Sequence, residues 1–232
     1  MGIYVGDKRY APYIGDNRRR YMGGGGSSYD ENSYIQDGLV FQLDGINKGS
    51  NQGDWTDLKG GCMFQVPEAE GLAEQNNCYT WTDNVNMPLH SGVIPQGVGC
   101  SVEIAMYNTV PTGTRKWGTF GSANGSTGGI INIGGFSNYQ FNFINRCRYL
   151  HLNNLVRNHF TTVSYCSAYA CVDKIEVALE ASVDYLTGTC GVGNSYGIGM
   201  RGSVYAIRVY NRQLTLAEMQ FNQYIDLKRF GT

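Results

Sequence analysis

The chain has 232 residues, of which 42% are hydrophobic, so it can bury a core and is not a disordered chain. It contains 32 glycines and 17 tyrosines while only 16% of its residues are charged, a balance that favours short strands and tight turns over long helices. The formal net charge is −1, and no basic patch in the body points to a nucleic-acid partner. No run approaches the roughly 20 apolar residues of a membrane-spanning helix, so no membrane partner is expected either.

The first 22 residues form a basic, tyrosine-rich segment that repeats itself: "YVGD" at 4–7 is echoed by "YIGD" at 13–16. Five basic side chains stand against two aspartates here, so the segment carries +3 and the remainder of the chain carries −4. Alternating Tyr, Val and Ile residues suit strand addition to a partner. We therefore expect residues 1–22 to be an extended arm that docks on another protein or on copies of this chain, through Tyr4, Val5, Tyr13, Ile14, Arg18, Arg19 and Arg20.

The stretch "GGGGSSYDENS" follows the arm and is typical of a flexible linker, because its residues are small, polar and without periodicity. We assign residues 23–35 to this linker and residues 36–232 to a single folded domain.

Short segments that alternate between apolar and polar residues predict β-strands in this domain, at the spacing of a sandwich or barrel. The segment "DKIEVALEA" (173–181) also has helix propensity, but the alternation of Ile175, Val177 and Leu179 favours a strand. The expected strands cover 38–45, 62–66, 77–81, 100–108, 117–121, 129–134, 139–145, 160–166, 173–181 and 202–211.

The segment "TLAEMQFNQYIDLKRFG" departs from this pattern and predicts one helix after the last strand. Thr215 and Glu218 have the spacing of a capping box, and Gly231 can end the helix. We expect the helix to lie on the sandwich and to bury an apolar stripe formed by Leu216, Met219, Tyr224, Ile225 and Leu227.

Two stretches at the ends of this domain resemble laminin-G-like domains of the concanavalin A-like jelly-roll superfamily. "DGLVFQLDGIN…WTDLKGG" (37–61) is similar to their opening strand and W-x-D-L-S/K-G turn, and "GSVYAIRVYNRQLTLAEMQFNQYIDLKRFG" (202–231) to their closing strand and helix. The resemblance implies an all-β, two-sheet antiparallel jelly-roll sandwich with one C-terminal α-helix. In the turn, we expect Trp55 and Leu58 to fill the sandwich edge and Asp57 to accept hydrogen bonds from backbone amides.

The arm resembles the N-terminal pieces of laminin-G-like proteins encoded by phages of gut Bacteroides-like bacteria, which are regarded as virion fibres or capsid decoration proteins. This resemblance implies a structural display protein that is assembled in the host cytoplasm and located in the virion. Its partners would be other virion proteins or copies of itself in a homo-oligomer. The alternative is a soluble carbohydrate-binding lectin or a glycoside hydrolase of the concanavalin A-like superfamily.

Catalytic residues are hard to find in the sequence. A retaining glycosidase needs two carboxylates about 5 Å apart, yet Glu103 stands alone, and Glu176 and Glu180 share a strand face without a carboxylate between them. No Cys or carboxylate stands at metal-ligand spacing from His151 or His159. We therefore expect a protein that is not an enzyme.

No cofactor is expected, and calcium remains an alternative. The aspartates in or near loops form no D-x-D-x-D run, and they are Asp44, Asp54, Asp57, Asp83 and Asp173. The seven cysteines have irregular spacings and no CxxC pair, which is typical of buried small hydrophobic residues, with one or two disulfides as the alternative.

Folds of this kind bind ligands through loops or a concave sheet, where aromatic side chains stack on sugar rings. The alternative for each aromatic residue is packing in the core or at a sheet edge. Our candidates for binding a cell-surface glycan are Tyr79, Trp81, Trp117, Tyr139 and Tyr149.

Overall fold

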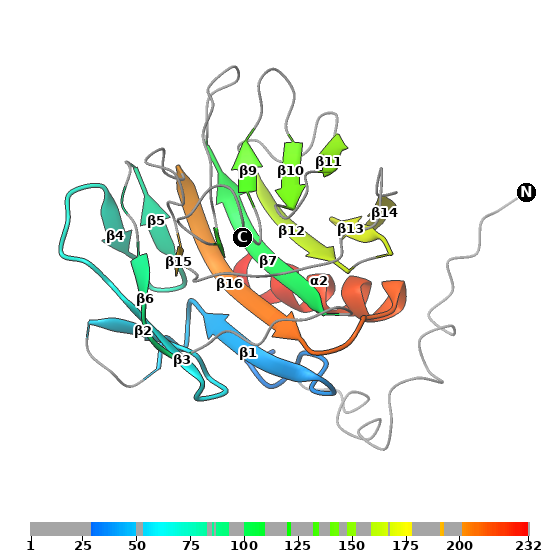
Figure 1. Cartoon of the computed structure of the whole chain (residues 1–232), viewed down its shortest axis with the longest axis horizontal. Coiled ribbons are helices and arrows are strands. Elements are labelled where there is room, and N and C mark those ends of the chain that lie inside the picture. The colour runs from blue at the N-terminus through cyan, green and yellow to red at the C-terminus, as the bar shows by residue number, and fades with distance from the viewer. Residues whose placement is uncertain are drawn as a thin grey trace, which may run out of the picture.

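The computed structural model of the chain is mostly β-structure with one helix (Figure 1). This confirms the expected fold class. All paired strands run antiparallel, and the helix lies at the C-terminal end. The residues that the structure describes are 29–49, 53–82, 85, 87–92, 100–109, 120–121, 132–134, 140–143, 148–151, 159–166, 168–177, 191–192 and 201–231.

The main sheet has eight strands and is organised around β16 (Gly202–Tyr210). Its other strands are β1 (Leu39–Asp44), β4 (Leu72–Glu74), β5 (Tyr79–Trp81), β7 (Ser101–Asn108), β12 (Phe160–Tyr165), β13 (Ala170–Val172) and β14 (Ile175–Val177). β16 pairs with β7 on one side, and with β5 and β1 in succession on the other. Beyond β7 the sheet continues through β12 and β13 to β14, and beyond β5 it continues to β4.

Two smaller antiparallel sheets complete the described strands. One has five strands, in the order β2 (Asp54–Thr56), β3 (Cys62–Gln65), β6 (Met87–Gly92), β15 (Gly191–Val192) and β8 (Phe120–Gly121). The other has three, in the order β11 (Arg148–His151), β10 (Gln140–Phe143) and β9 (Asn132–Gly134).

The apolar core lies between one face of the main sheet and the β2–β3–β6 sheet. Alternate residues of β7 and β16 point into it, because successive side chains of a strand face opposite sides of the sheet. Phe41 of β1 meets Phe64 of β3 edge to face, with ring centroids 6.1 Å apart. Both rings are fully buried, together with Trp55, Met87, Val102, Ile104, Met106, Ile207 and Val209.

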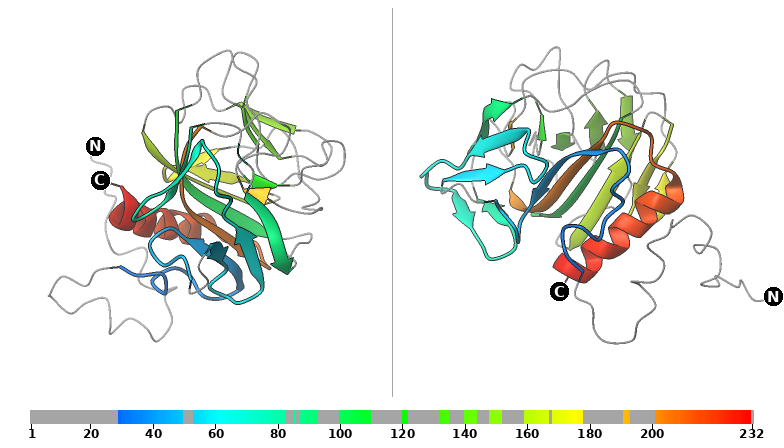
Figure 2. Two further views of the ribbon diagram at one scale, coloured as in Figure 1. Left: turned by 90° about the vertical axis from the view of Figure 1, so that its left-hand side faces the viewer. Right: turned by 90° about the horizontal axis from the view of Figure 1, so that it is seen from below.

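The helix α2 (Leu216–Phe230) covers the opposite face of the main sheet and contacts β12, β13 and β7 (Figure 2). The predicted capping box is confirmed: Glu218 N–H donates to Thr215 Oγ1 at 3.3 Å, and Thr215 N–H donates to Glu218 Oε2 at 2.8 Å. The helix ends at Phe230, and the N–H of Gly231 donates to the Leu227 carbonyl. No helix in the described part of the chain is both long and apolar enough to cross a membrane.

The predicted apolar stripe of the helix is only partly right. Met219 and Ile225 are buried as expected, but Tyr224 is 36% exposed and Leu227 is 44% exposed. The helix instead turns three polar side chains towards the sheet, because polar groups of the sheet bond them there. These three side chains are Asn222, Gln223 and Asp226.

Each predicted strand contains a strand of the structure, and the short strands β2, β4, β6, β11, β13 and β15 add to them. The segment 173–181 differs most, because Asp173 and Lys174 form a turn that joins β13 to β14. Both residues have positive φ angles, 47° and 70°. Two consecutive positive φ angles are those of the type I′ turn, whose twist matches that of the strands it joins.

The turn between β2 and β3 forms as predicted. Asp57 Oδ1 accepts hydrogen bonds from the backbone N–H groups of Gln42 and Lys59 at 2.8 and 2.9 Å, and Asp57 Oδ2 accepts from Gly61 at 3.0 Å. Trp55 is fully buried and its indole N–H donates to the Asp44 carbonyl. Asp57 therefore joins this turn to β1, which fixes the edge of the sandwich.

Residues 29–35, which the sequence analysis placed in the linker, pack against the body of the domain. Tyr34 is 3% exposed and its hydroxyl donates to Asp226 Oδ1 at 2.8 Å. The N–H of Ile35 donates to Asn222 Oδ1 at 3.0 Å. The arm itself, including Tyr4, Val5, Tyr13, Ile14, Arg18, Arg19 and Arg20, lies outside the described residues, so its role stays a prediction.

Candidate functional site

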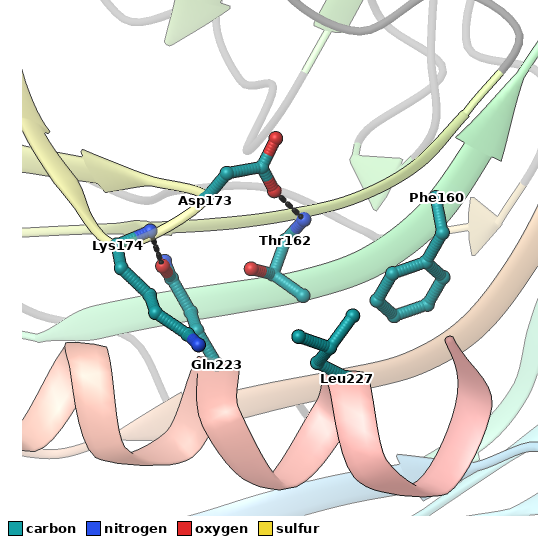
Figure 3. Close-up of a pocket in the computed structure, with 6 residues that line it drawn as sticks. All are labelled: Phe160, Thr162, Asp173, Lys174, Gln223 and Leu227. Carbon is teal, nitrogen blue, oxygen red and sulfur yellow. Dashed lines mark hydrogen bonds between the residues drawn. The ribbon is translucent and has the colours of Figure 1, made fainter. Parts of the chain in front are cut away.

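A surface pocket of about 160 Å³ lies between α2 and the turn that joins β13 to β14 (Figure 3). Pockets for drug-sized ligands measure roughly 300–1,000 Å³, so this one suits a single small ring. It is lined by Phe160 and Thr162 from β12, Asp173 and Lys174 from the turn, and Gln223 and Leu227 from α2.

The turn that forms one wall is clamped between β12 and the helix. Thr162 N–H donates to Asp173 Oδ1 at 2.9 Å, and Asp173 N–H donates to the Thr162 carbonyl at 3.0 Å. Lys174 N–H donates to Gln223 Oε1 at 2.6 Å, and Gln220 Nε2 donates to the Lys174 carbonyl at 2.8 Å. Because β12 holds Asp173 and α2 holds Lys174, the turn is fixed from two sides and the wall of the pocket is pre-organised.

Gln223 is a positioning residue in this pocket. Its side-chain nitrogen donates to Ser164 Oγ and to the Cys171 carbonyl, at 2.9 and 2.8 Å. Its side-chain oxygen accepts from Lys174 N–H and from Cys171 Sγ. With both ends of the amide engaged and the residue 1% exposed, Gln223 holds the turn on the helix.

Among the residues that line the pocket are an aromatic ring, an aliphatic side chain and two charged side chains. The Phe160 ring is held edge to face against Tyr205, with centroids 5.3 Å apart. Asp173 Oδ2 lies 3.5 Å from Nε2 of His159, and the Asp173 side chain is 33% exposed. With Leu227 and Lys174, the pocket joins apolar contact to a hydrogen-bond acceptor and a donor.

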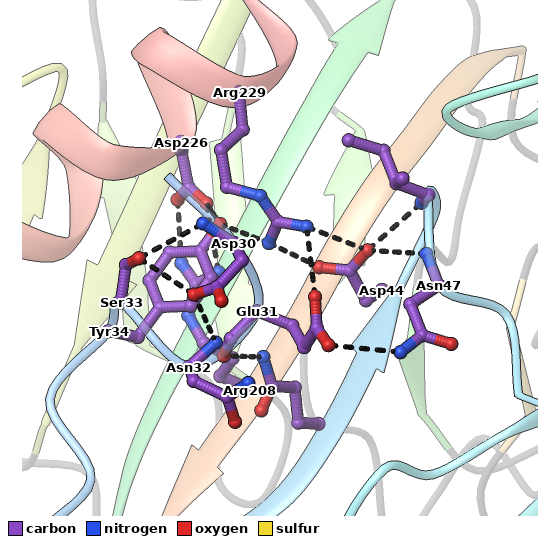
Figure 4. Close-up of polar contacts among 12 residues, drawn as sticks. Asp30, Glu31, Asn32, Ser33, Tyr34, Asp44, Asn47, Arg208, Asp226 and Arg229 are labelled. Atoms are coloured by element: carbon purple, nitrogen blue, oxygen red, sulfur yellow. Dashed lines mark hydrogen bonds and ion pairs between the residues drawn. The ribbon is translucent and has the colours of Figure 1, made fainter. Parts of the chain in front are cut away.

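A second cluster of polar side chains is a buried network of charges between α2 and the main sheet (Figure 4). Arg208 donates from Nε to Glu103 Oε2 at 2.9 Å and from Nη1 and Nη2 to Asp226 at 2.8 and 2.6 Å. Glu103 also accepts from Ser164 Oγ and Asn222 Nδ2. Burial raises the pKa of Glu103, and the Arg208 charge opposes that rise.

Glu103, the isolated carboxylate of the sequence analysis, is thus held by hydrogen-bond donors from β12, β16 and α2. It is 1% exposed, and both its oxygens are occupied by protein donors, so no substrate reaches it. Its role in this structure is to join β7 to β16 and α2.

Tyr34 extends this network to residues 29–37. Its ring centroid lies 3.9 Å from the guanidinium carbon of Arg208 and 5.5 Å from that of Arg229. Arg229 also donates to the Tyr34 hydroxyl at 3.2 Å and from Nη2 to Asp44 Oδ1 at 3.1 Å. Burial raises the pKa of the Tyr34 phenol well above its usual range, so the hydroxyl remains a donor to Asp226.

Of the aromatic residues predicted to bind a glycan, some are buried in the core and others lie outside the described residues. Tyr79 and Trp81 are 2% and 1% exposed, and their rings pack in the core beside Trp55, which leaves no ring face for a ligand. Tyr149 lies in β11 opposite Asn142 of β10. Trp117 and Tyr139 lie outside the described residues, so with Tyr149 they stay predictions.

No local pattern in the sequence connects the residues of the pocket. The signal that could have found its wall is Asp173-Lys174 between two β-prone segments, "ACV" and "IEV", which is a hairpin pattern. That Phe160 and Leu227 lie beside this turn depends on how α2 packs on the sheet, which no local pattern encodes.

Metal binding and thiol chemistry have little support among the described residues. There, no group of three or more His, Cys, Asp or Glu side chains is placed to hold a metal ion. Burial raises the pKa of Cys62 to about 11 and that of Cys171 to about 12, so these thiols stay protonated. The cysteines that the structure describes as free are Cys62, Cys78, Cys100, Cys166 and Cys171.

Comparison with known proteins finds no matching family model and no matching curated protein. Among solved structures, Trypanosoma rangeli sialidase matches with a TM-score of 0.56 at 12% identity, over 80% of this chain and 32% of that one. Domain 4 of AbnA, a GH43 extracellular arabinanase from Geobacillus stearothermophilus, in complex with arabinotriose, matches with a TM-score of 0.53 at 12% identity, over 78% and 96%. The botulinum neurotoxin type G receptor-binding domain matches with a TM-score of 0.58 at 10% identity, over 82% and 51%.

This chain thus spans about a third of the length of the sialidase chain it matches. Two of these structures belong to enzymes, a sialidase and an arabinanase, and this overturns the expectation drawn from the sequence that the chain is not an enzyme. At identities of 10–12% the likeness shows the fold alone, which is an antiparallel β-sandwich consistent with a jelly roll.

Proposed function

We propose that this chain is a carbohydrate-recognition β-sandwich, and that the pocket between α2 and the Asp173-Lys174 turn holds one sugar ring. The observation that carries the proposal is the composition of the pocket: an oriented Phe160 ring and Leu227 beside a carboxylate and an ammonium group on a clamped turn. The likeness to an arabinanase domain that was solved with arabinotriose supports it, because that domain is matched over 96% of its length.

A sugar ring has an apolar face of C–H groups and an edge of hydroxyls, and the pocket offers a partner for each. The apolar face packs on Phe160 and Leu227, while hydroxyls donate to Asp173 and accept from Lys174. The bonds from Thr162 and Gln223 hold the turn before a ligand arrives, so little conformational entropy is lost on binding. The small volume suits the terminal unit of a glycan.

The test is a glycan array with the full chain, followed by calorimetric titration of each glycan that binds. Phe160→Ala and Asp173→Asn should each weaken binding at least tenfold. Ile46→Ala, which also truncates an exposed apolar side chain (50% exposed) but lies away from the pocket, should leave it unchanged. Melting temperatures of all variants separate lost binding from lost folding. Binding that survives both pocket substitutions would exclude this pocket.

Whether a bound glycan is also cleaved is a separate question. Hydrolysis by a pair of carboxylates needs a second acid 5–10 Å from the first, across the sugar ring. Among the described residues that line the pocket, Asp173 is the carboxylate. A reducing-sugar assay on each glycan that binds therefore distinguishes a lectin from a glycoside hydrolase.

We propose, as a second role, that the chain is displayed on a phage virion and anchored by residues 1–22, in contact with other virion proteins or with copies of itself. The repeated "YVGD" and "YIGD" motifs and the +3 charge of this segment favour the proposal. Deleting residues 1–26 should leave a folded domain that no longer enters its assembly, as measured by co-sedimentation with virions and by size-exclusion chromatography. Unchanged incorporation would refute it.

A further inference from the structure

Two lysine side chains stand beside the pocket on one tyrosine ring. Nζ of Lys174, which lines the pocket, lies 5.3 Å from the ring centroid of Tyr224, and Nζ of Lys228 lies 5.5 Å from the same centroid. Tyr224 is 36% exposed and Lys228 is exposed, so both ammonium groups lie where a ligand can meet them.

Asp173 and Asp226, which stand near these lysines in the sequence, form no ion pair with them. Asp226 binds Arg208 and the Tyr34 hydroxyl, and Asp173 binds Thr162 N–H and lies beside His159. Within the described part of the chain, no carboxylate lies within 4.0 Å of either ammonium group. Both ammonium groups are therefore open to an anionic group of a ligand, beside the one carboxylate among the described lining residues, that of Asp173.

Apolar and aromatic side chains adjoin this rim. Leu227, which lines the pocket, is 44% exposed. Ile175, which follows the lining residue Lys174 in the chain, is 65% exposed. Tyr29 meets the Tyr224 ring edge to face, with centroids 5.8 Å apart. Tyr29 and the two lysines therefore contact one ring, that of Tyr224.

We infer that the ligand of this pocket is an acidic sugar, in which a pyranose ring carries a carboxylate. The ring packs on Phe160 and Leu227, and the carboxylate binds the ammonium groups of Lys174 and Lys228. This inference rests on the proposed glycan binding and specifies its ligand class. Charge-assisted hydrogen bonds are about twice as strong as neutral ones, so the carboxylate would dominate selectivity.

The experiment compares matched glycans that differ only in the acidic unit, by calorimetric titration of the full chain. Sialyllactose is compared with lactose, and a glucuronic acid glycoside with the corresponding glucoside. We expect the acidic member of at least one pair to bind ten or more times more tightly at low salt, which corresponds to about 1.4 kcal/mol. The advantage should shrink as salt is raised, because the lysines are exposed to solvent.

Lys228→Met should remove most of this advantage while leaving binding of the neutral member unchanged, because Lys228 does not line the pocket. Lys174→Met should weaken binding of both members, and of the acidic member more, because Lys174 lines the pocket and also donates to hydroxyls. Lys59→Met is the matched control, since Lys59 is an exposed lysine on the β2–β3 turn whose ammonium binds Gln36. If both members of each pair bind with equal affinity, and Phe160→Ala abolishes that binding, the acidic-sugar inference is overturned. The proposal that this pocket binds a glycan then stands. If no acidic or neutral glycan binds, both proposals fail.

Discussion

Replacing Arg208 with Met tests whether the buried charge network holds α2 on the sheet. Arg208 is fully buried and makes three hydrogen bonds, one to Glu103 and two to Asp226. The substitution keeps a long apolar side chain but leaves two buried carboxylates without their cation. Breaking a buried ion pair in this way costs about 3–5 kcal/mol, and domains are stable by only about 5–15 kcal/mol. We therefore expect Arg208→Met to remove a large fraction of the free energy of unfolding.

The assay is urea unfolding followed by tryptophan fluorescence and circular dichroism, over a range of pH. The matched control is Arg212→Met, because Arg212 makes a comparable two-bond contact with Glu218 at the surface, where the Arg212 side chain is 28% exposed. Exposed ion pairs contribute about 0.2–1 kcal/mol, so the control should lose little.

The pH dependence follows from the direction of the Glu103 shift. Its pKa in the folded state is raised above the ordinary 4.5 by burial, while Arg208 lowers it. A raised pKa means that the contribution of this group to stability is full below its ordinary pKa and is lost as the pH rises through the raised one. Without Arg208 the pKa of Glu103 should rise further. The difference in free energy of unfolding between Arg208→Met and the native protein should therefore narrow as the pH falls. A loss no larger than that of Arg212→Met, with no pH dependence, would refute the role of the network.

Three further predictions concern the N-terminal segment and the helix. Tyr34→Phe removes the hydroxyl that donates to Asp226 and should cost about 1.5–3 kcal/mol in urea unfolding, the range for a hydrogen bond to a charged group; an unchanged midpoint would contradict it. Deleting residues 1–28 should leave the melting temperature near that of the full chain, whereas deleting residues 1–37 should lower it sharply, because Tyr34 is then lost from between Arg208 and Arg229; equal melting temperatures would argue against this. Thr215→Ala removes the N-cap of α2 and should destabilise the protein by about 1 kcal/mol, while Thr215→Ser should restore most of that; a Ser variant as unstable as the Ala variant would rule out capping.

The sequence allowed more of the fold to be predicted than of the candidate site. The strands, the Asp57 turn and the capped helix were predictable because each depends on neighbours within a few residues. Arg208 lies opposite Glu103 in the register of β16 and β7, about a hundred residues apart in the chain, and no local pattern pairs those two strands. The turn at 173–174 likewise forms the wall of a pocket only because α2 packs beside it.

The sequence by itself determined the local structure of this protein. Alternation specified which residues of a strand share a face, and Thr215 with Glu218 specified where the helix begins. Only the tertiary structure decided which faces are covered, since alternation does not say which side of a sheet meets solvent. Tyr79 and Trp81 therefore lie in the core, while Tyr224 and Leu227 lie at the surface. The polar side chains of Asn222, Gln223 and Asp226 are buried for the same reason: the sheet beneath the helix supplies the partners that make their burial stable.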